Sequence, residues 1–116
     1  MKLIKRRTIY FENENINVIV IDFGASFYVW VGKFSNIESL SVSFPLSNNK
    51  SISNEFASSS LLGEDELCTS ISSYLCRQLK APILLSINTA NIEINDMNIN
   101  EFKHLVNKNI VNLIME

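Results

Sequence analysis

Short runs of consecutive apolar residues place the strongest constraint on the fold of this chain. The clearest are residues 18–21 (VIVI), 27–31 (FYVWV) and 83–85 (ILL). A strand with one face in water alternates apolar and polar residues, whereas an uninterrupted apolar strand indicates a sheet covered on both faces. We therefore expect a sheet that has both of its faces covered.

Strand signals fill the first two-thirds of the sequence. Gly24 suits a turn at residues 22–25, which joins its two flanking strands in a hairpin. Pro45 ends a later strand because proline cannot donate a ladder hydrogen bond, and the Asn- and Ser-rich residues 47–51 predict a loop. We predict strands over residues 3–11, 16–23, 26–31, 38–44, 52–58 and 83–87.

The apolar residues change their period after residue 64. Acidic residues 64–66 precede a helical pattern that ends with Arg77 and Lys80, and these charges complement a helix dipole. The apolar side chains of this helix, residues 64–80, fall within an arc of about 140°: Leu67, Ile71, Tyr74, Leu75 and Leu79. A second stripe predicts a C-terminal helix: Ile99, Phe102, Leu105, Val106, Ile110 and Leu113.

These elements predict an α+β fold in one domain, residues 1–116. We expect a mainly antiparallel sheet of about six strands with two helices on one face. Two helices cover only one face of such a sheet, so a second subunit that packs sheet on sheet is the simplest cover for the other face. We expect the isolated chain to form a homodimer in place of that pair, or to behave poorly alone.

Charge and cysteine usage narrow the possible functions and locations. A net charge of −2 gives no case for binding nucleic acid or an anionic membrane. No apolar run is long enough to cross a bilayer, and residues 1–7 lack the apolar core of a secretory signal. Cys68 and Cys76 lie about 12 Å apart along one predicted helix, too far for a disulfide. We expect free thiols and a location in the cytosol or nucleus.

No group of residues has the makings of a catalytic or metal site. His104 is the only histidine and lies opposite the apolar stripe of its helix, which predicts a solvated side chain. We place the two thiols on different sides of their helix, so they and one distant histidine do not make a zinc site. Neither a phosphate-binding glycine loop nor a nucleophile motif around Ser58–Ser60 is present. The acids at 64–66 fit a helix start better than a cation site. We expect no cofactor and no enzyme, with a small hydrolase the weakest reading.

The only basic cluster is at residues 2–7, where Lys2, Lys5, Arg6 and Arg7 lie. On an edge strand, these charges would discourage strand-to-strand aggregation. They would also suit an acidic protein surface. RNA binding is a third and weaker reading, because the aromatic residues that it needs lie in core-like strands.

Tyr28 and Trp30 are the residues that we expect at a partner interface. In a strand they share one face, while Phe27, Val29 and Val31 share the other. The second set is uniformly apolar and suits the space beneath the helices. Tyr28 and Trp30 each combine an apolar body with one polar group, a type enriched in interface cores. The alternative is that Trp30 fills the core of its own subunit.

Two stretches resemble one known family, proteasome assembly chaperone 4. Residues 16–32 (INVIVIDFGASFYVWVG), which include Phe27, Val31 and Gly32, are similar to its strand–turn–strand signature. Ser60, Leu61, Leu62 and Gly63, followed by acids, are similar to the start of its first helix. In this reading, Leu61 and Leu62 anchor the helix start in the core.

The resemblance covers residues 16–115, and the related chaperone 3 shares the Leu-Leu-Gly-acid step. Residues 47–54 and 91–100 carry no distinctive family content.

The resemblance implies a specific function. Chaperones 3 and 4 of this kind pair as a heterodimer, bind α-type proteasome subunits, promote assembly of the seven-membered α ring and then leave. It implies no nucleotide, metal or other cofactor. The alternative reading from the residues alone is a generic dimeric adaptor or scaffold protein with another client.

Overall fold

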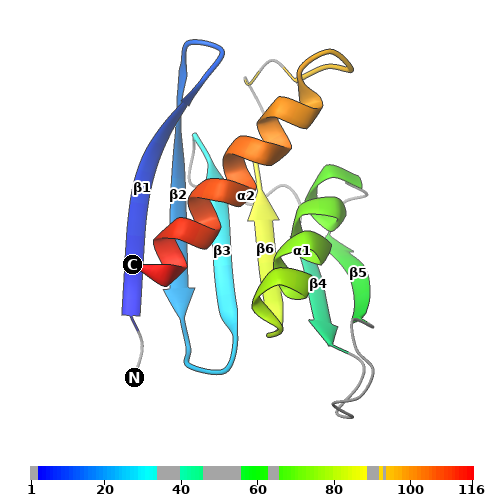
Figure 1. Cartoon of the computed structure of the whole chain (residues 1–116). Helices are drawn as coiled ribbons and strands as arrows, with labels where there is room; N and C mark the ends of the chain where they lie inside the picture. Colours follow the sequence, from blue (N-terminus) through cyan, green and yellow to red (C-terminus); the bar gives the residue numbers. More distant parts are fainter. Residues whose placement is uncertain (1–2, 34–39, 46–55, 63–65, 89–91, 93) are drawn as a thin grey trace.

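A computed structural model describes residues 3–33, 40–45, 56–62, 66–88, 92 and 94–116 (Figure 1). Helix α1 lies between the fifth and sixth strands of the chain, and α2 is the last element. The helices are α1 (Glu66–Leu79) and α2 (Ile99–Met115). The strands are β1 (Leu3–Phe11), β2 (Glu14–Asp22), β3 (Phe27–Gly32), β4 (Leu40–Pro45), β5 (Phe56–Leu62) and β6 (Ile83–Ile87).

The six strands form one mixed sheet in the order β1-β2-β3-β6-β4-β5. β3 and β6 are parallel, and the other neighbouring pairs are antiparallel. The predicted turn at Gly24 is present, because the Gly24 N–H donates to Asp22 Oδ1 at 2.7 Å and Gly24 has a φ of +96°. The α+β class and the mainly antiparallel sheet are therefore confirmed.

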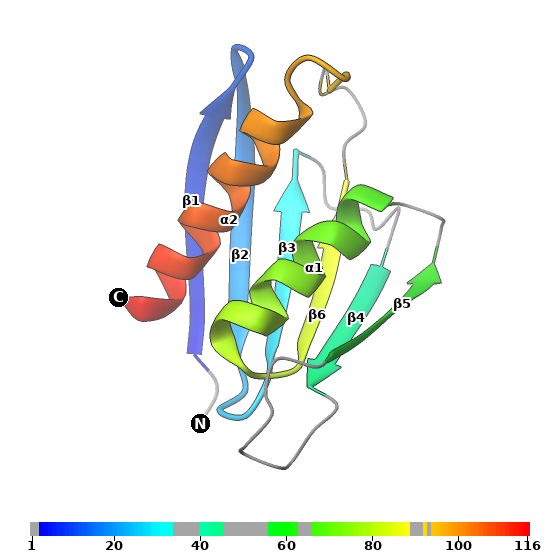
Figure 2. The same cartoon turned by 45° about the vertical axis from the view of Figure 1, so that its right-hand side comes forward.

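Both helices pack on the same face of the sheet (Figures 1 and 2). α2 lies against β1 and β2, whereas α1 lies against β4, β5 and β6. Beneath them, alternate strand residues are fully buried, among them Val18, Val29 and Leu85. The predicted stripe of α2 supplies Phe102, whose ring meets that of Phe11 edge to face at 5.1 Å. The core thus lies between one sheet face and the two helices.

The basic segment of β1 is tied to the end of α2. Lys5 Nζ donates to the backbone carbonyl oxygen of Leu113 at 3.0 Å and also to that of Glu116. Arg7 forms an ion pair with the Glu116 carboxylate. Cations at a helix C-terminus satisfy carbonyl groups that have no partner within the helix and complement its dipole. Lys5 and Arg7 therefore have a structural role within the chain.

The predicted stripe of α1 is partly wrong. Tyr74 is 41% exposed rather than buried, whereas Cys68, Ser72 and Cys76 lie in the core. The Ser72 hydroxyl shares a buried hydrogen bond of 2.8 Å with that of Ser43 on β4. The two cysteines are free, as predicted, but they lie on the same buried side of the helix and not on different sides. Small polar residues fit this interface because the hydroxyl groups bind each other.

The segment before α1 also differs from its prediction. A strand at residues 52–58 was expected, followed by a helix entry at residues 60–63 that leads into a helix over 64–80, but the backbone of Ser60, Leu61 and Leu62 belongs to β5. β5 pairs with β4, with Ser59 opposite Val42. Gly63, the acids at 64 and 65, and the loop at 47–51 lie outside the described residues. Leu61 and Leu62 are therefore the last residues of an edge strand, and helix α1 begins at Glu66.

Candidate partner interface

The strand register places Tyr28 and Trp30 on the sheet face away from the helices. Trp30 is opposite Ile19 of β2 and Ser86 of β6, while Tyr28 is opposite Ile21 and Leu84. Their neighbours in the chain, Val29 and Val31, are fully buried on the helix side. Phe27 lies with Val29 and Val31, as the alternation of a strand requires.

This second face, which we call the open face, is apolar at its centre. The partly exposed residues Ile19, Ile21, Trp30, Leu84 and Val42 cross β2, β3, β6 and β4 in one band. On β1 the band continues to Ile4, which is 59% exposed. Among the described residues no helix packs on this face (Figures 1 and 2). A contiguous apolar band of this kind is typical of a protein–protein interface.

Sequence reasoning found Tyr28 and Trp30 but did not name the rest of the open face. Ile19 and Ile21 could have been assigned from the apolar run at residues 18–21, because alternate residues of a strand share a face. Their place beside Trp30 also depends on the hairpin register. Ile4, Val42 and Leu84 depend on the sheet order, which puts β6 between β3 and β4. The sequence pattern carries no signal for that order.

The absence of a side chain at Gly32 leaves room for the indole of Trp30. A Cβ at Gly32 would lie 3.2 Å from Trp30 Cζ2 and 2.9 Å from Asn88 Cβ. The indole thus extends along β3 over Gly32, next to the end of β6. The Trp-Val-Gly end of the sequence motif has a packing reason, since a side chain at position 32 would clash with Asn88 and crowd the indole of Trp30.

Two polar atoms on the open face lack hydrogen-bond partners. Trp30 Nε1 and Ser86 Oγ are buried, at paired positions of β3 and β6, and neither makes a hydrogen bond among the described residues. An unsatisfied buried polar group costs about 1–3 kcal/mol. On the helix side, the buried hydroxyl groups of Ser43 and Ser72 are paired with each other, while Asn107 Oδ1 of α2 also lacks a partner among the described residues.

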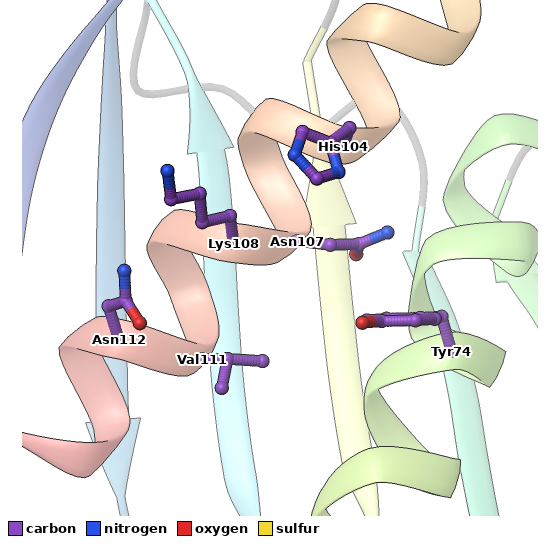
Figure 3. A pocket seen from close by; sticks show the side chains of 6 residues that line it. All are labelled: Tyr74, His104, Asn107, Lys108, Val111 and Asn112. Atoms are coloured by element: carbon purple, nitrogen blue, oxygen red, sulfur yellow. The ribbon is translucent and has the colours of Figure 1, made fainter.

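A shallow hollow of about 290 Å³ lies on the helix side of the molecule (Figure 3). Tyr74 of α1 and Asn107 of α2 point toward each other there, while His104 and Lys108 line the outer surface of α2. His104 is exposed, as predicted. Burial raises the pKa of the Cys76 thiol, which keeps it protonated and unreactive.

The described residues hold no group of three or more His, Cys, Asp or Glu side chains with the spacing of a metal site. None of the described helices combines the length and the apolar character needed to cross a membrane. The feature of the described chain that indicates a function is therefore the open face.

The fold of this chain is also found in a solved structure. Its structure is similar to a chain in the crystal structure of a chaperone complex for yeast 20S proteasome assembly, with a TM-score of 0.68 and 13% sequence identity. The alignment covers 98% of this chain and 95% of that chain. A comparison with curated protein sequences gave no match. The two chains share the α+β fold described above.

The sequence identifies the family. Residues 15–89 match the family model of proteasome assembly chaperone 4. The matched region includes the hairpin of β2 and β3, with Tyr28 and Trp30, and continues through α1 and β6. The chain belongs to the proteasome assembly chaperone 4 family, which confirms the resemblance seen in the sequence. It is a non-catalytic proteasome assembly chaperone.

Proposed function

We propose that the chain pairs with a similar subunit of the chaperone 3 type and binds α-type proteasome subunits. In this proposal the pair promotes assembly of the 20S α ring and then dissociates. Family membership supports it, as does the shared fold with a chain of a yeast chaperone complex for 20S proteasome assembly. We also propose that the chain acts in the cytosol or nucleus, where the thiols of Cys68 and Cys76 stay reduced.

The open face is the observation that carries the pairing proposal. Its apolar band would leave Trp30 and the isoleucine side chains of β2 in partial contact with water in a single chain. A second sheet that packs against it removes that surface from water, at roughly 25 cal/mol for each Å² of apolar area. The same geometry gives a two-sheet core with helices on the outside, which is a stable layer arrangement.

The helix side is then left for other contacts. With the open face occupied by the partner subunit, α1 and α2 lie on the outer surface of the pair. Tyr74, at 41% exposure, would stay accessible there. We propose that the α-type subunits contact outer surfaces of this kind, so that pairing and client binding use different residues.

Co-expression with a chaperone 3-type subunit from the same cell, followed by size-exclusion chromatography with light scattering, tests the pairing. We expect a stable one-to-one complex that retains added α-type subunits. Ile21→Asp on the open face should abolish pairing because it buries an unpaired charge. Tyr74→Asp on the helix side is the matched control and should leave pairing intact. A complex that still forms with the Ile21→Asp variant would contradict the proposal. So would a chain that binds neither the chaperone 3-type subunit nor the α-type subunits.

A further inference from the structure

The position of Arg6 indicates which kind of subunit the open face accepts. Successive residues of β1 point to opposite faces of the sheet. Lys5 and Arg7 point to the helix side and bind the end of α2. Arg6 lies between them, opposite Ile19 in the register, and so belongs to the open face. It is exposed and forms no ion pair among the described residues.

Arg6 is next to further hydrogen-bond donors. Thr8 and Asn17, also on the open face, are opposite each other in the register, and Thr8 Oγ1 lies 3.0 Å from Asn17 Oδ1. Because the carbonyl oxygen of Asn17 accepts this hydrogen bond, its amide nitrogen keeps two N–H donors. A hollow of about 410 Å³ is lined by Arg6, Arg7, Thr8 and Asn17. The hollow therefore offers a guanidinium and an amide to one acceptor group.

The hollow is continuous with the apolar band. Arg6 is opposite Ile19, and Ile19 is opposite Trp30 on the next strand. Neighbouring strands are about 4.8 Å apart, so Arg6 lies roughly 10 Å from Trp30 across the sheet. A sheet that covers Trp30 extends over Arg6 as well, since a standard interface spans 20–30 residues on each side.

Among the described strand residues, a second copy of the chain has no carboxylate on its open face to pair with Arg6. Of the strand residues that the register places on the open face, within the described ranges, Arg6 is the only one with a formal charge. The described acids of β2, Glu14 and Asp22, belong to the helix side, where Glu14 binds Lys33. Whatever the crossing angle, strand residues of a second copy would offer Arg6 no carboxylate. An uncompensated charge in an interface opposes binding.

We propose that Arg6 and the Asn17 amide bind a carboxylate on the open face of a different subunit, and that this contact selects that subunit over a second copy. Arg6 favours a carboxylate because its planar guanidinium donates two parallel hydrogen bonds. In this proposal the apolar band provides most of the contact area, and Arg6 makes binding specific for a subunit that carries the carboxylate. This inference rests on the proposed function, because the occupant is the chaperone 3-type subunit.

The test measures the affinity of the purified chain for the chaperone 3-type subunit by calorimetry, at low and at high ionic strength. Arg6→Met keeps the length of the side chain and removes its charge. We expect it to weaken the pair by about tenfold to a hundredfold and to flatten its salt dependence. Lys108→Met, on the outer surface of α2, is the matched control and should change neither quantity.

Sedimentation of the isolated chain gives the second readout. Arg6→Met should leave self-association unchanged or strengthen it, because the described strands of a second copy carry no carboxylate on their open face. Equal weakening of the mixed pair and of self-association would overturn the inference, as would a mixed pair whose affinity stays within twofold. If the unaltered chain fails to bind the chaperone 3-type subunit, the proposed function fails, and the inference fails with it. That failure is recognised from the unaltered chain and not from the variant.

Discussion

Trp30 and Gly32 share one site on the open face, where the six-membered ring of the indole lies over a position that has no side chain. A Cβ at residue 32 would approach Trp30 Cζ2 to 3.2 Å and Asn88 Cβ to 2.9 Å. The second distance is shorter than real side chains show. Trp30 lies in β3, and Asn88 follows the end of β6, where its backbone N–H donates to the carbonyl oxygen of Val31 at 2.8 Å. The orientation of the indole, and with it the shape of the interface, therefore depends on the absence of one methyl group.

Gly32→Ala should lower the free energy of unfolding by about 1–3 kcal/mol, the usual cost of overpacking. It should also weaken pairing, because the indole must move. Gly24→Ala is the control, since a Cβ there would meet nothing within 4 Å and the cost arises from the φ of +96° alone. Chemical denaturation and a pairing assay on both variants separate the effects. Unchanged pairing by the folded Gly32→Ala variant would show that the indole position is not required.

Phe102 is the largest fully buried side chain of α2 and joins the helix to β1 through Phe11. Phe102→Ala should lower the free energy of unfolding by about 3–5 kcal/mol, through lost transfer energy and a cavity. Met115→Ala is the control, because Met115 is 75% exposed in the same helix and should change stability by less than about 0.5 kcal/mol. Similar losses for the two variants in urea denaturation would contradict the described core.

The two helices show where a sequence pattern was enough and where it was not. In α2, all four buried residues, Phe102, Val106, Ile110 and Leu113, were predicted by helical periodicity. The other two residues of the predicted stripe, Ile99 and Leu105, are partly buried against the core. In α1, periodicity placed Tyr74 in the core and left out Ser72. The difference arises because α1 packs on β4, whose inward residues are Ser41 and Ser43. Hydrophobicity alone cannot anticipate a buried surface that is held by hydroxyl pairs.

The strands show a similar limit. The hairpin of β2 and β3 followed from apolar runs on either side of Gly24, and the face of Trp30 followed from alternation. The end of β5 did not follow, because Leu61 and Leu62 fit a helix start as well as a strand. Residues 61 and 62 are part of a strand because β5 pairs with β4, and a local sequence pattern does not predict such long-range pairing. In the sequence, Arg6 belongs to a basic cluster with Lys5 and Arg7, but the strand register places it on the opposite face of the sheet.

Lys5→Met tests the link between β1 and the end of α2. The variant keeps the aliphatic stem and removes the donor to the carbonyl oxygens of Leu113 and Glu116. We expect a loss of about 1 kcal/mol in the free energy of unfolding, because those carbonyl groups lose a charged donor. Arg6→Met is the matched control on the opposite face and should be neutral in the isolated chain. Equal effects of both variants in urea denaturation would show that the helix end does not need Lys5.

Trp30→Ala tests the open face at its centre. If this face binds the partner subunit, the variant should weaken pairing by about 2 kcal/mol or more, because an aromatic anchor in an interface core carries a large share of the binding energy. Its far-ultraviolet circular dichroism should stay unchanged, since the core beneath the helices does not contain Trp30. Val29→Ala is the matched control, one residue away and fully buried on the helix side. It should lower the stability of the chain, while its folded fraction should pair normally. If Trp30→Ala unfolds the chain as a core variant does, or if pairing is unaffected, the open face is not the partner interface.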